Sequence, residues 1–258
     1  MLFRSQEVPD GTALGEASGS CETNSLSVTL VTGEVYGGRT VVLTTGTFLA
    51  GRLITGERVT PGGRAGEPPA TALSGALRRL GLSLGRLKTG TPPRIDVHSI
   101  DFTAGVLHPG HPTPQYFSYL HQADRRDADA LVPGWGPRHA AYPIDPASDP
   151  AWRPQLPCYL LHTTAETQAV VRANLHRAPM FNGTIEGRGP RYCPSFEDKV
   201  HRFPERPQHP LFLEPEGWDS DEVYLQGANT SLPEDVQEAM LRSIPGLQRC
   251  RITRDRKS

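Results

Sequence analysis

The segment GRGPRYCPSFEDKVHRF, at positions 187–203, combines one thiol with several cations. Pro190 and Pro194 flank Cys193 closely and restrict the backbone on both sides of it. Positive charge near a cysteine favours its thiolate, the nucleophilic form of the side chain, and guanidinium groups also bind phosphates. The segment therefore predicts either a reactive cysteine beside a phosphate-bearing ligand or a proline-bounded surface loop whose cysteine only packs.

A second candidate region is the basic stretch at positions 52–94. Although the whole chain of 258 residues has a net charge of −1, this stretch has eight cations and two carboxylates, a local charge of +6. It contains no Phe, Tyr or Trp. Such a composition suits contact with phosphate groups better than stacking on unpaired bases. The alternative interpretation is a solvated face with ordinary ion pairs.

Two loops are expected to position these groups. The apolar run at 41–43 predicts a short buried strand that ends in the sequence TTGT, and a dinucleotide can lie at this edge of an open α/β sheet. The sequence TGTPP at 89–93 cannot continue a helix. It predicts a fixed loop that holds Lys88 and Arg94 on either side.

Local patterns predict further elements around these loops. Positions 27–46 are typical of two strands around a turn, with SVTLVT at 27–32 and RTVVLTTG at 39–46 on either side of GEVYGG at 33–38. Positions 212–213 are typical of a strand that runs into a turn. Positions 70–80 predict a helix with one apolar side, which ends before Gly81. Positions 104–157, rich in Pro, Gly, His and Asp, predict a long irregular insertion. Capping boxes predict two more helix starts, at Thr163 with Glu166 and at Ser231 with Glu234.

Four blocks of the sequence are similar, in the same order, to the MnmG/GidA family of flavoproteins, which modify the wobble uridine of certain tRNAs and have a mitochondrial member. One block is the cysteine segment described above. The others are VVLTTGTFLAG at 41–51, GGRAGEPP followed by GRLKTGTPPRID up to position 96, and FLEPEGWDSDEVYLQGANTSLP at 212–233. The resemblance extends from about position 27 to about position 254.

The resemblance implies an α/β fold: a partial FAD/NAD(P)-binding, Rossmann-like sheet with an inserted α+β domain. Residues 1–26 would be an unmatched leader, 27–96 a partial FAD-binding domain with the basic stretch, 97–225 an insertion domain that resembles an NADH-binding domain, and 226–258 a return to the FAD-binding domain. The sequence has no GxGxxG turn, with which a complete flavin-binding half would hold a pyrophosphate. We therefore expect a part of a longer flavoprotein, with weakened retention of FAD.

The family installs an aminomethyl-type group, such as carboxymethylaminomethyl, at C5 of the uridine. The resemblance implies FAD, NADH and a folate-derived methylene donor, a GTPase partner of the MnmE type, a homodimer, and a cytoplasmic or alternatively mitochondrial location. No apolar run is long enough to span a membrane. Two alternatives are a non-catalytic tRNA-binding module and a folate- and FAD-dependent tRNA uracil-5-methyltransferase, a shorter relative.

The resemblance also assigns residues. Cys193 would act as a nucleophile towards C6 of the uridine or lie beside the flavin. Ala70 stands where the family commonly has serine, so a flavin contact there could use only the backbone. No metal site is expected, because the four cysteines form no CxxC pair. Expected nucleic-acid contacts are Arg64, Arg86, Lys88 and Arg94. Expected cofactor contacts are Thr45, Gly46, Thr47, Ala70, Gly189, Pro190, Arg191, Tyr192, Cys193, Pro194, Ser195, Phe196, Glu197, Asp198, Lys199, Val200, His201, Arg202 and Phe203.

Overall fold

The computed structural model describes residues 26–30, 32–63, 67–111, 142–143, 156–185, 194–217 and 220–254. Its largest element is a six-stranded sheet built from β5 (Arg94–Asp96), β6 (Val106–His108), β7 (Cys158–His162), β8 (Pro210–Pro215), β9 (Glu222–Gln226) and β10 (Ile252–Arg254). The strand order is β10-β5-β9-β8-β7-β6, and every pair of neighbours is antiparallel.

Two hairpins and four α-helices complete the described fold. The hairpins pair β1 (Leu26–Thr29) with β2 (Val35–Gly38) and β3 (Arg52–Thr55) with β4 (Arg58–Pro61). The helices are α1 (Thr71–Arg79), α3 (Ala165–Ala173), α4 (Phe196–Arg202) and α5 (Glu234–Arg242), and short 3-10 turns are η1 (Val97–Ser99), η2 (Phe102–Ala104) and η3 (Leu175–Arg177). Within these ranges, no helix is long and apolar enough to cross a membrane.

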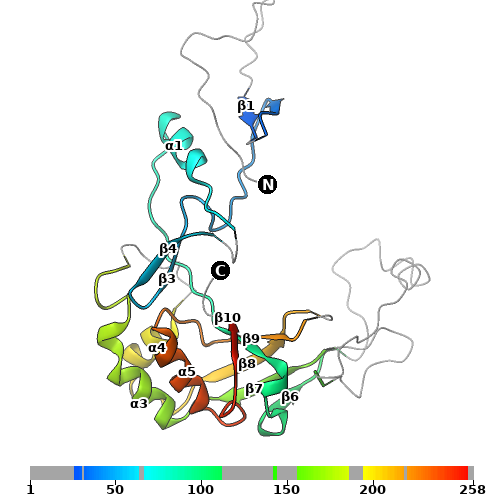
Figure 1. Ribbon diagram of the computed structural model, residues 1–258, viewed down its shortest axis with the longest axis vertical. Helices are drawn as coiled ribbons and strands as arrows, with labels where there is room; N and C mark the ends of the chain where they lie inside the picture. Colours follow the sequence, from blue (N-terminus) through cyan, green and yellow to red (C-terminus); the bar gives the residue numbers. More distant parts are fainter. Residues whose placement is uncertain are drawn as a thin grey trace, which may run out of the picture.

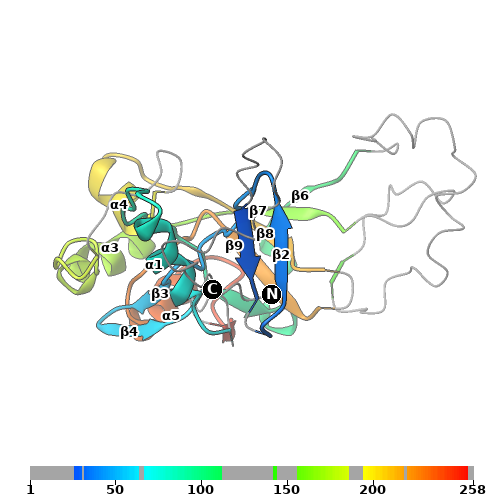
Figure 2. The same cartoon turned by 90° about the horizontal axis from the view of Figure 1, so that it is seen from above.

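One face of the six-stranded sheet and the helices α3, α4 and α5 enclose the core. In β8, Leu211 and Leu213 are fully buried, whereas Phe212 between them is only partly buried, as the two-residue period of a strand requires. Leu225 of β9 and Val171 of α3 are also fully buried in this core. Figure 1 shows the three helices gathered beside the sheet, and in the view from above β6 points away from α3 and α4 (Figure 2).

Several local predictions are confirmed. The strand expected at 27–32 is β1, and β8 covers the strand expected before the turn at 214–217. The segment 33–38, expected as the turn, instead contains β2, which pairs with β1. Helix α1 follows the expected spacing, because Leu73 and Leu77 are buried and Gly81 follows the helix with φ +82°. Leu80, expected on the same apolar side, is 69% exposed.

The capping box at the start of α3 lies one residue later than expected. The Thr164 hydroxyl accepts the amide of Thr167 at 3.2 Å, and the Thr167 hydroxyl accepts the amide of Thr164 at 3.1 Å. The Thr163 hydroxyl instead accepts the amide of His209 at 2.9 Å, so it joins the helix entry to the start of β8. The expected pairing with Glu166 is therefore wrong, because a contact distant in sequence occupies Thr163.

The capping box expected at the start of α5 is also wrong. The N-cap residue is Pro233, and no side chain caps the helix. The Ser231 hydroxyl donates to Glu197 Oε1 at 2.9 Å instead of capping the helix next to Glu234. Competition from a buried carboxylate therefore overrides a local signal that is otherwise correct about the presence of a helix.

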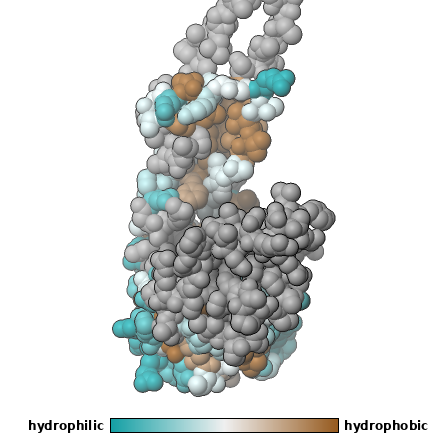
Figure 3. Space-filling model, turned by 90° about the vertical axis from the view of Figure 1, so that its right-hand side faces the viewer, coloured by the Kyte–Doolittle hydropathy of each residue, from teal (hydrophilic) through white to brown (hydrophobic). Residues whose placement is uncertain are grey.

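The buried strand expected at 41–43 is wrong. Residues 41–43 form no strand, and the Val42 side chain is 84% exposed. A buried strand needs hydrogen-bonded neighbours, and no described strand pairs with this segment. Val41 and Leu43 are also exposed, and Figure 3 shows hydrophobic surface in brown in the upper part of the molecule.

The structure shows a mixed helix-and-sheet fold and does not confirm the Rossmann-like arrangement. Among the described residues, all strand pairs are antiparallel, with one isolated parallel bridge between Leu49 and Ala70. β10 pairs with β5, which pairs with β9, so one sheet joins the segments expected as separate domains at 27–96, 97–225 and 226–258. The bounds of these three domains stay a prediction.

Most of the insertion expected at 104–157 lies outside the described residues. Its first part is not irregular, because β6 pairs with β7. The Tyr142 phenol, also in this segment, is buried and donates to the Pro157 carbonyl at 2.6 Å. The described parts of the insertion are therefore packed onto the sheet.

His209 is a buried titratable group between the helices and the sheet. It is 4% exposed, its ring lies 5.6 Å from that of Phe196 between centroids, and its Nε2 atom has no hydrogen-bond partner. Burial lowers the pKa of His209, and the positive charges of Lys199 and Arg206 lower it further. The folded protein therefore favours the neutral imidazole.

This environment predicts acid sensitivity. Below about pH 6.5 the histidine of the unfolded chain takes up a proton before that of the folded chain, so the free energy of unfolding should fall as the pH decreases through that value. Urea denaturation of the wild type and of His209→Gln at a series of pH values measures this effect. The variant should lose part of the pH dependence, whereas His176→Gln, a change at an exposed histidine, should retain it. Identical pH profiles for all three proteins would contradict the prediction.

Candidate functional site

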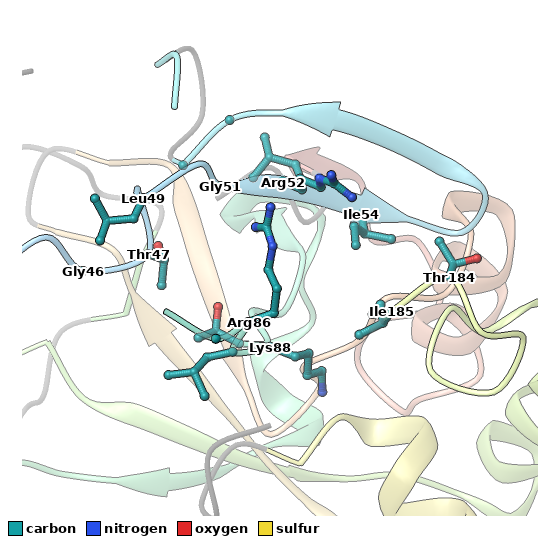
Figure 4. Close-up of a pocket in the computed structure, with 16 residues that line it drawn as sticks. Gly46, Thr47, Leu49, Gly51, Arg52, Ile54, Arg86, Lys88, Thr184 and Ile185 are labelled. Carbon is teal, nitrogen blue, oxygen red and sulfur yellow. The ribbon is translucent and has the colours of Figure 1, made fainter. Parts of the chain in front are cut away.

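A pocket of about 390 Å³ opens beside the β3–β4 hairpin (Figure 4). Arg52, Arg86 and Lys88 line it, and none of the described lining residues is acidic. Thr184 and Ile185 form another side of the pocket, on the segment that leads to the predicted reactive cysteine. The volume lies within the range of small-molecule sites. An excess of cations makes an anionic ligand the best match.

Close backbone contacts form one wall of the pocket. The Gly62 amide donates to the Gly51 carbonyl at 3.1 Å, and a Cβ atom at Gly51 would collide with the Gly62 carbonyl. Gly63 packs equally closely against Phe48. Glycine at these positions lets segments of the chain pack closely beside the cavity.

The cations of the pocket are held in different ways. Arg86 Nη1 donates to the Ala50 carbonyl at 2.9 Å, which fixes the guanidinium across the cavity. Lys88 is 7% exposed, so its ammonium is largely removed from water and needs polar or anionic neighbours. Figure 4 shows Arg86 extending towards Gly51 and Lys88 extending towards the side of Ile185. A ligand in the pocket would therefore meet positive charge from two directions.

The TGTPP loop after Lys88 is fixed, as the sequence predicts. The Asn229 Nδ2 group donates to the Gly90 carbonyl at 3.1 Å, and the Thr230 amide donates to the Thr91 carbonyl at 3.4 Å. Both contacts join the loop to the segment before α5. The loop therefore takes its position from residues almost 140 positions later in the chain.

Arg94, at the other end of this loop, is bound within the protein. Its Nε atom lies 2.5 Å from Glu216 Oε1, its Nη1 group donates to the Thr91 hydroxyl at 2.6 Å, and its guanidinium lies 4.6 Å above the centre of the Tyr224 ring. These contacts join β5 to β9 and to the turn after β8. They favour a structural role, and contact with nucleic acid stays a prediction for this residue.

Helix α4 begins inside the predicted cofactor segment, and several of its side chains turn into the protein. Glu197 is fully buried, and its Oε1 atom accepts the amide of Ser231 at 3.0 Å and the hydroxyl of Ser231 at 2.9 Å. Lys199 Nζ donates to the Gly227 carbonyl at 3.1 Å. The Ser195 hydroxyl caps the helix by accepting the amide of Asp198 at 3.3 Å. The start of this helix is therefore bound to the 227–231 segment.

The predicted site residues are only partly brought together. Gly46, Thr47, Arg86 and Lys88 line the pocket, whereas residues 194–203 do not. The Ala70 amide donates to the Phe48 carbonyl, so that amide is already used within the chain. Arg64, Gly189, Pro190, Arg191, Tyr192 and Cys193 lie outside the described residues.

Sequence reasoning missed several residues of the pocket. Arg52 belongs to the basic stretch, which indicated phosphate contacts, but its charge alone did not distinguish it from the other cations there. The other missed residues include Ile54, Gly62, Gly63, Thr184 and Ile185. Their sequence neighbourhoods contain no feature that would indicate a shared cavity.

The two described cysteines are poor nucleophiles. Both are free thiols, and burial raises the pKa of Cys158 and, to about 11, that of Cys250. Neither therefore favours the thiolate near neutral pH. The prediction of a reactive thiol stays with Cys193.

The antiparallel sheet, its helical cover and the glycine-walled pocket define a mixed helix-and-sheet protein with a cationic pocket. Residues 17–132 and 135–255 match the family model GIDA, described as "Glucose inhibited division protein A", and the chain belongs to this family. The resemblance found in the sequence blocks is therefore confirmed.

Proteins named as tRNA uridine modification enzymes are similar to this chain over most of its length. The "tRNA uridine 5-carboxymethylaminomethyl modification enzyme MnmG" of Roseiflexus sp. (strain RS-1) is 54% identical over 245 residues, which are 95% of this chain and 36% of that protein. A protein of the same name from Chloroflexus aurantiacus is 54% identical over 238 residues, 91% of this chain and 36% of that protein. The chain thus spans about a third of the length of these curated relatives.

A solved structure supports the same assignment. GidA from Aquifex aeolicus, in its form I crystal, superposes with a TM-score of 0.69 at 40% sequence identity. The superposition covers 89% of this chain and 35% of that chain. The described fold is therefore similar to a part of that protein.

The Glu197 contact generates a prediction about stability. Glu197→Ala should lower the free energy of unfolding by roughly 3 kcal/mol, because two hydrogen bonds to a buried carboxylate disappear and the Ser231 donors lose their acceptor. Glu197→Gln keeps an acceptor and should lose less. Glu238→Ala is the matched control, because this glutamate is exposed and pairs with Arg242 only at the surface. Urea denaturation that gives equal losses for Glu197→Ala and Glu238→Ala would contradict the assignment.

Proposed function

We propose that this chain takes part in the modification of a uridine of tRNA at C5. The observation that carries the proposal is the pocket lined by Arg52, Arg86 and Lys88, in a chain whose relatives are named as tRNA uridine modification enzymes. Because RNA is a polyanion, the positive charges of these side chains attract its backbone from any sequence. The pocket would hold a phosphate close to the uridine that reacts.

The proposal includes the cofactors FAD and NADH. The residues present fit a phosphate-bearing cofactor, because cations line the cavity and none of the described lining residues is acidic. Gly46 and Thr47 would hold FAD, which when bound supplies the redox chemistry of the reaction. Arg202, whose side chain is 67% exposed, is better placed than Lys199 to meet a phosphate of NADH.

The proposal also includes a nucleophile and partners. Cys193 would attack C6 of the uridine, with cations of its own segment stabilising the thiolate. The MnmE-type GTPase partner, the homodimer and a cytoplasmic location extend the same proposal. They are supported by the family to which the chain belongs.

A reconstitution experiment tests the activity. The full chain is incubated with unmodified tRNA, FAD, NADH, methylene-folate and the GTPase partner, and the nucleosides are analysed by mass spectrometry. The proposal predicts a uridine with an aminomethyl-type group at C5 and loss of this product in Cys193→Ser. Methyluridine as the product would favour the uracil-5-methyltransferase alternative. Full activity of Cys193→Ser would exclude the nucleophilic role.

A second candidate function is tRNA binding without catalysis. It is favoured by a cationic pocket that needs no cofactor to bind phosphate. Absence of product in the reconstitution, combined with salt-sensitive binding of tRNA, would select this candidate.

Both candidates predict that the pocket cations bind phosphate. Lys88→Gln and Arg86→Gln should each weaken tRNA binding and reduce the slope of log K against log salt by about one. Arg78→Gln is the matched control, because Arg78 belongs to the same basic stretch but does not line the pocket. Fluorescence anisotropy with labelled tRNA at several salt concentrations gives these slopes. Equal slopes for all three variants would place the phosphate contacts elsewhere.

A further inference from the structure

Two aromatic rings form an exposed pair next to the pocket. Phe181, in the turn after η3, is 40% exposed, and its ring centroid lies 5.1 Å from that of His201 on α4 at an interplanar angle of 64°. His201 is itself exposed. In an edge-to-face pair each ring covers at most one face of the other, so aromatic surface remains open to solvent.

This ring pair lies within a short distance of the pocket. Phe181 precedes Thr184 by three residues, and Thr184 and Ile185 line the cavity. An extended chain spans at most about 3.6 Å per residue, so the Cα atoms of Phe181 and Thr184 are no more than roughly 11 Å apart. Figure 4 shows Thr184 and Ile185 on the side of the pocket towards which Lys88 extends. A ligand in the cavity can therefore continue over this rim towards the rings.

Carboxylates of α4 do not oppose an anionic ligand here. Glu197 is buried against Ser231, and Asp198 pairs with Arg202 at 2.8 Å. Cations in the pocket and open aromatic rings beside it are the two components with which proteins bind unpaired nucleotides: the cations follow the backbone and the rings stack on bases.

We propose that Phe181 and His201 form a stacking platform for an unpaired base of the RNA whose backbone lies in the Arg52–Arg86–Lys88 pocket. The inference rests on the proposed function and deepens it, because it names the side chains that would hold a base of that RNA beside the pocket. Aromatic stacking is the usual way in which proteins recognise unpaired bases of RNA.

Binding of two RNA probes to the full chain tests the platform. The probes are a labelled hairpin with an open loop and a labelled blunt duplex, measured by fluorescence anisotropy. Phe181→Ala should weaken binding of the hairpin by about five- to a hundredfold, with duplex binding and the salt slope unchanged, because stacking releases no counterions. Phe181→Trp should retain binding of the hairpin. Tyr36→Ala, which removes an exposed ring on β2, is the matched control and should bind as the wild type does.

The outcomes separate this inference from the proposed function. Binding of the hairpin by Phe181→Ala at wild-type strength, or equal losses for hairpin and duplex, would overturn the platform while the pocket remains an RNA site. Loss of NADH binding with unchanged RNA binding would assign the rings to a dinucleotide and would also overturn it. Failure of the wild type to bind either RNA would remove the proposed function and the platform together.

Discussion

The hydrogen bonds between Glu197 and Ser231 are the constraint on which the site depends. They fix the 229–231 segment against α4, and that segment then positions both walls of the pocket: the Ser231 carbonyl accepts the Gly56 amide of the β3–β4 turn at 2.8 Å, and Asn229 bonds to the Gly90 carbonyl. Removing a buried carboxylate that accepts two hydrogen bonds lowers the free energy of unfolding, because its donors are left without an acceptor. The pocket cations are therefore held by a contact that itself touches no ligand.

The sequence predicted the elements whose signals are local. Leucine spacing identified α1, and the two prolines of TGTPP identified a fixed loop. It failed where distant residues compete for the same groups. Ser231 has the correct spacing to cap α5, but Glu197, 34 residues earlier, takes its hydroxyl. The antiparallel order of the six strands likewise depends on pairings between distant segments, which no local pattern specifies.

In the candidate site, too, local sequence features were predictive and contacts between distant residues were not. Composition predicted phosphate contacts in the basic stretch, and two of the predicted residues, Arg86 and Lys88, line the pocket. Composition could not distinguish Arg94, whose guanidinium is bound to a carboxylate 122 residues away. Composition also gave no sign of aromatic side chains in this region, because Phe181 and His201 come from other segments of the chain. Charge and stacking surface thus meet only in the folded chain.

Hydrogen–deuterium exchange of the full chain with and without tRNA tests the central claim most directly, since it reports where RNA lies without altering any residue. The account predicts slower exchange in the β3–β4 hairpin, in residues 85–90 and in residues 181–185, the segments that form the pocket and its rim. Unchanged exchange in all three segments, with protection confined to other parts of the chain, would contradict the assignment of the pocket to RNA.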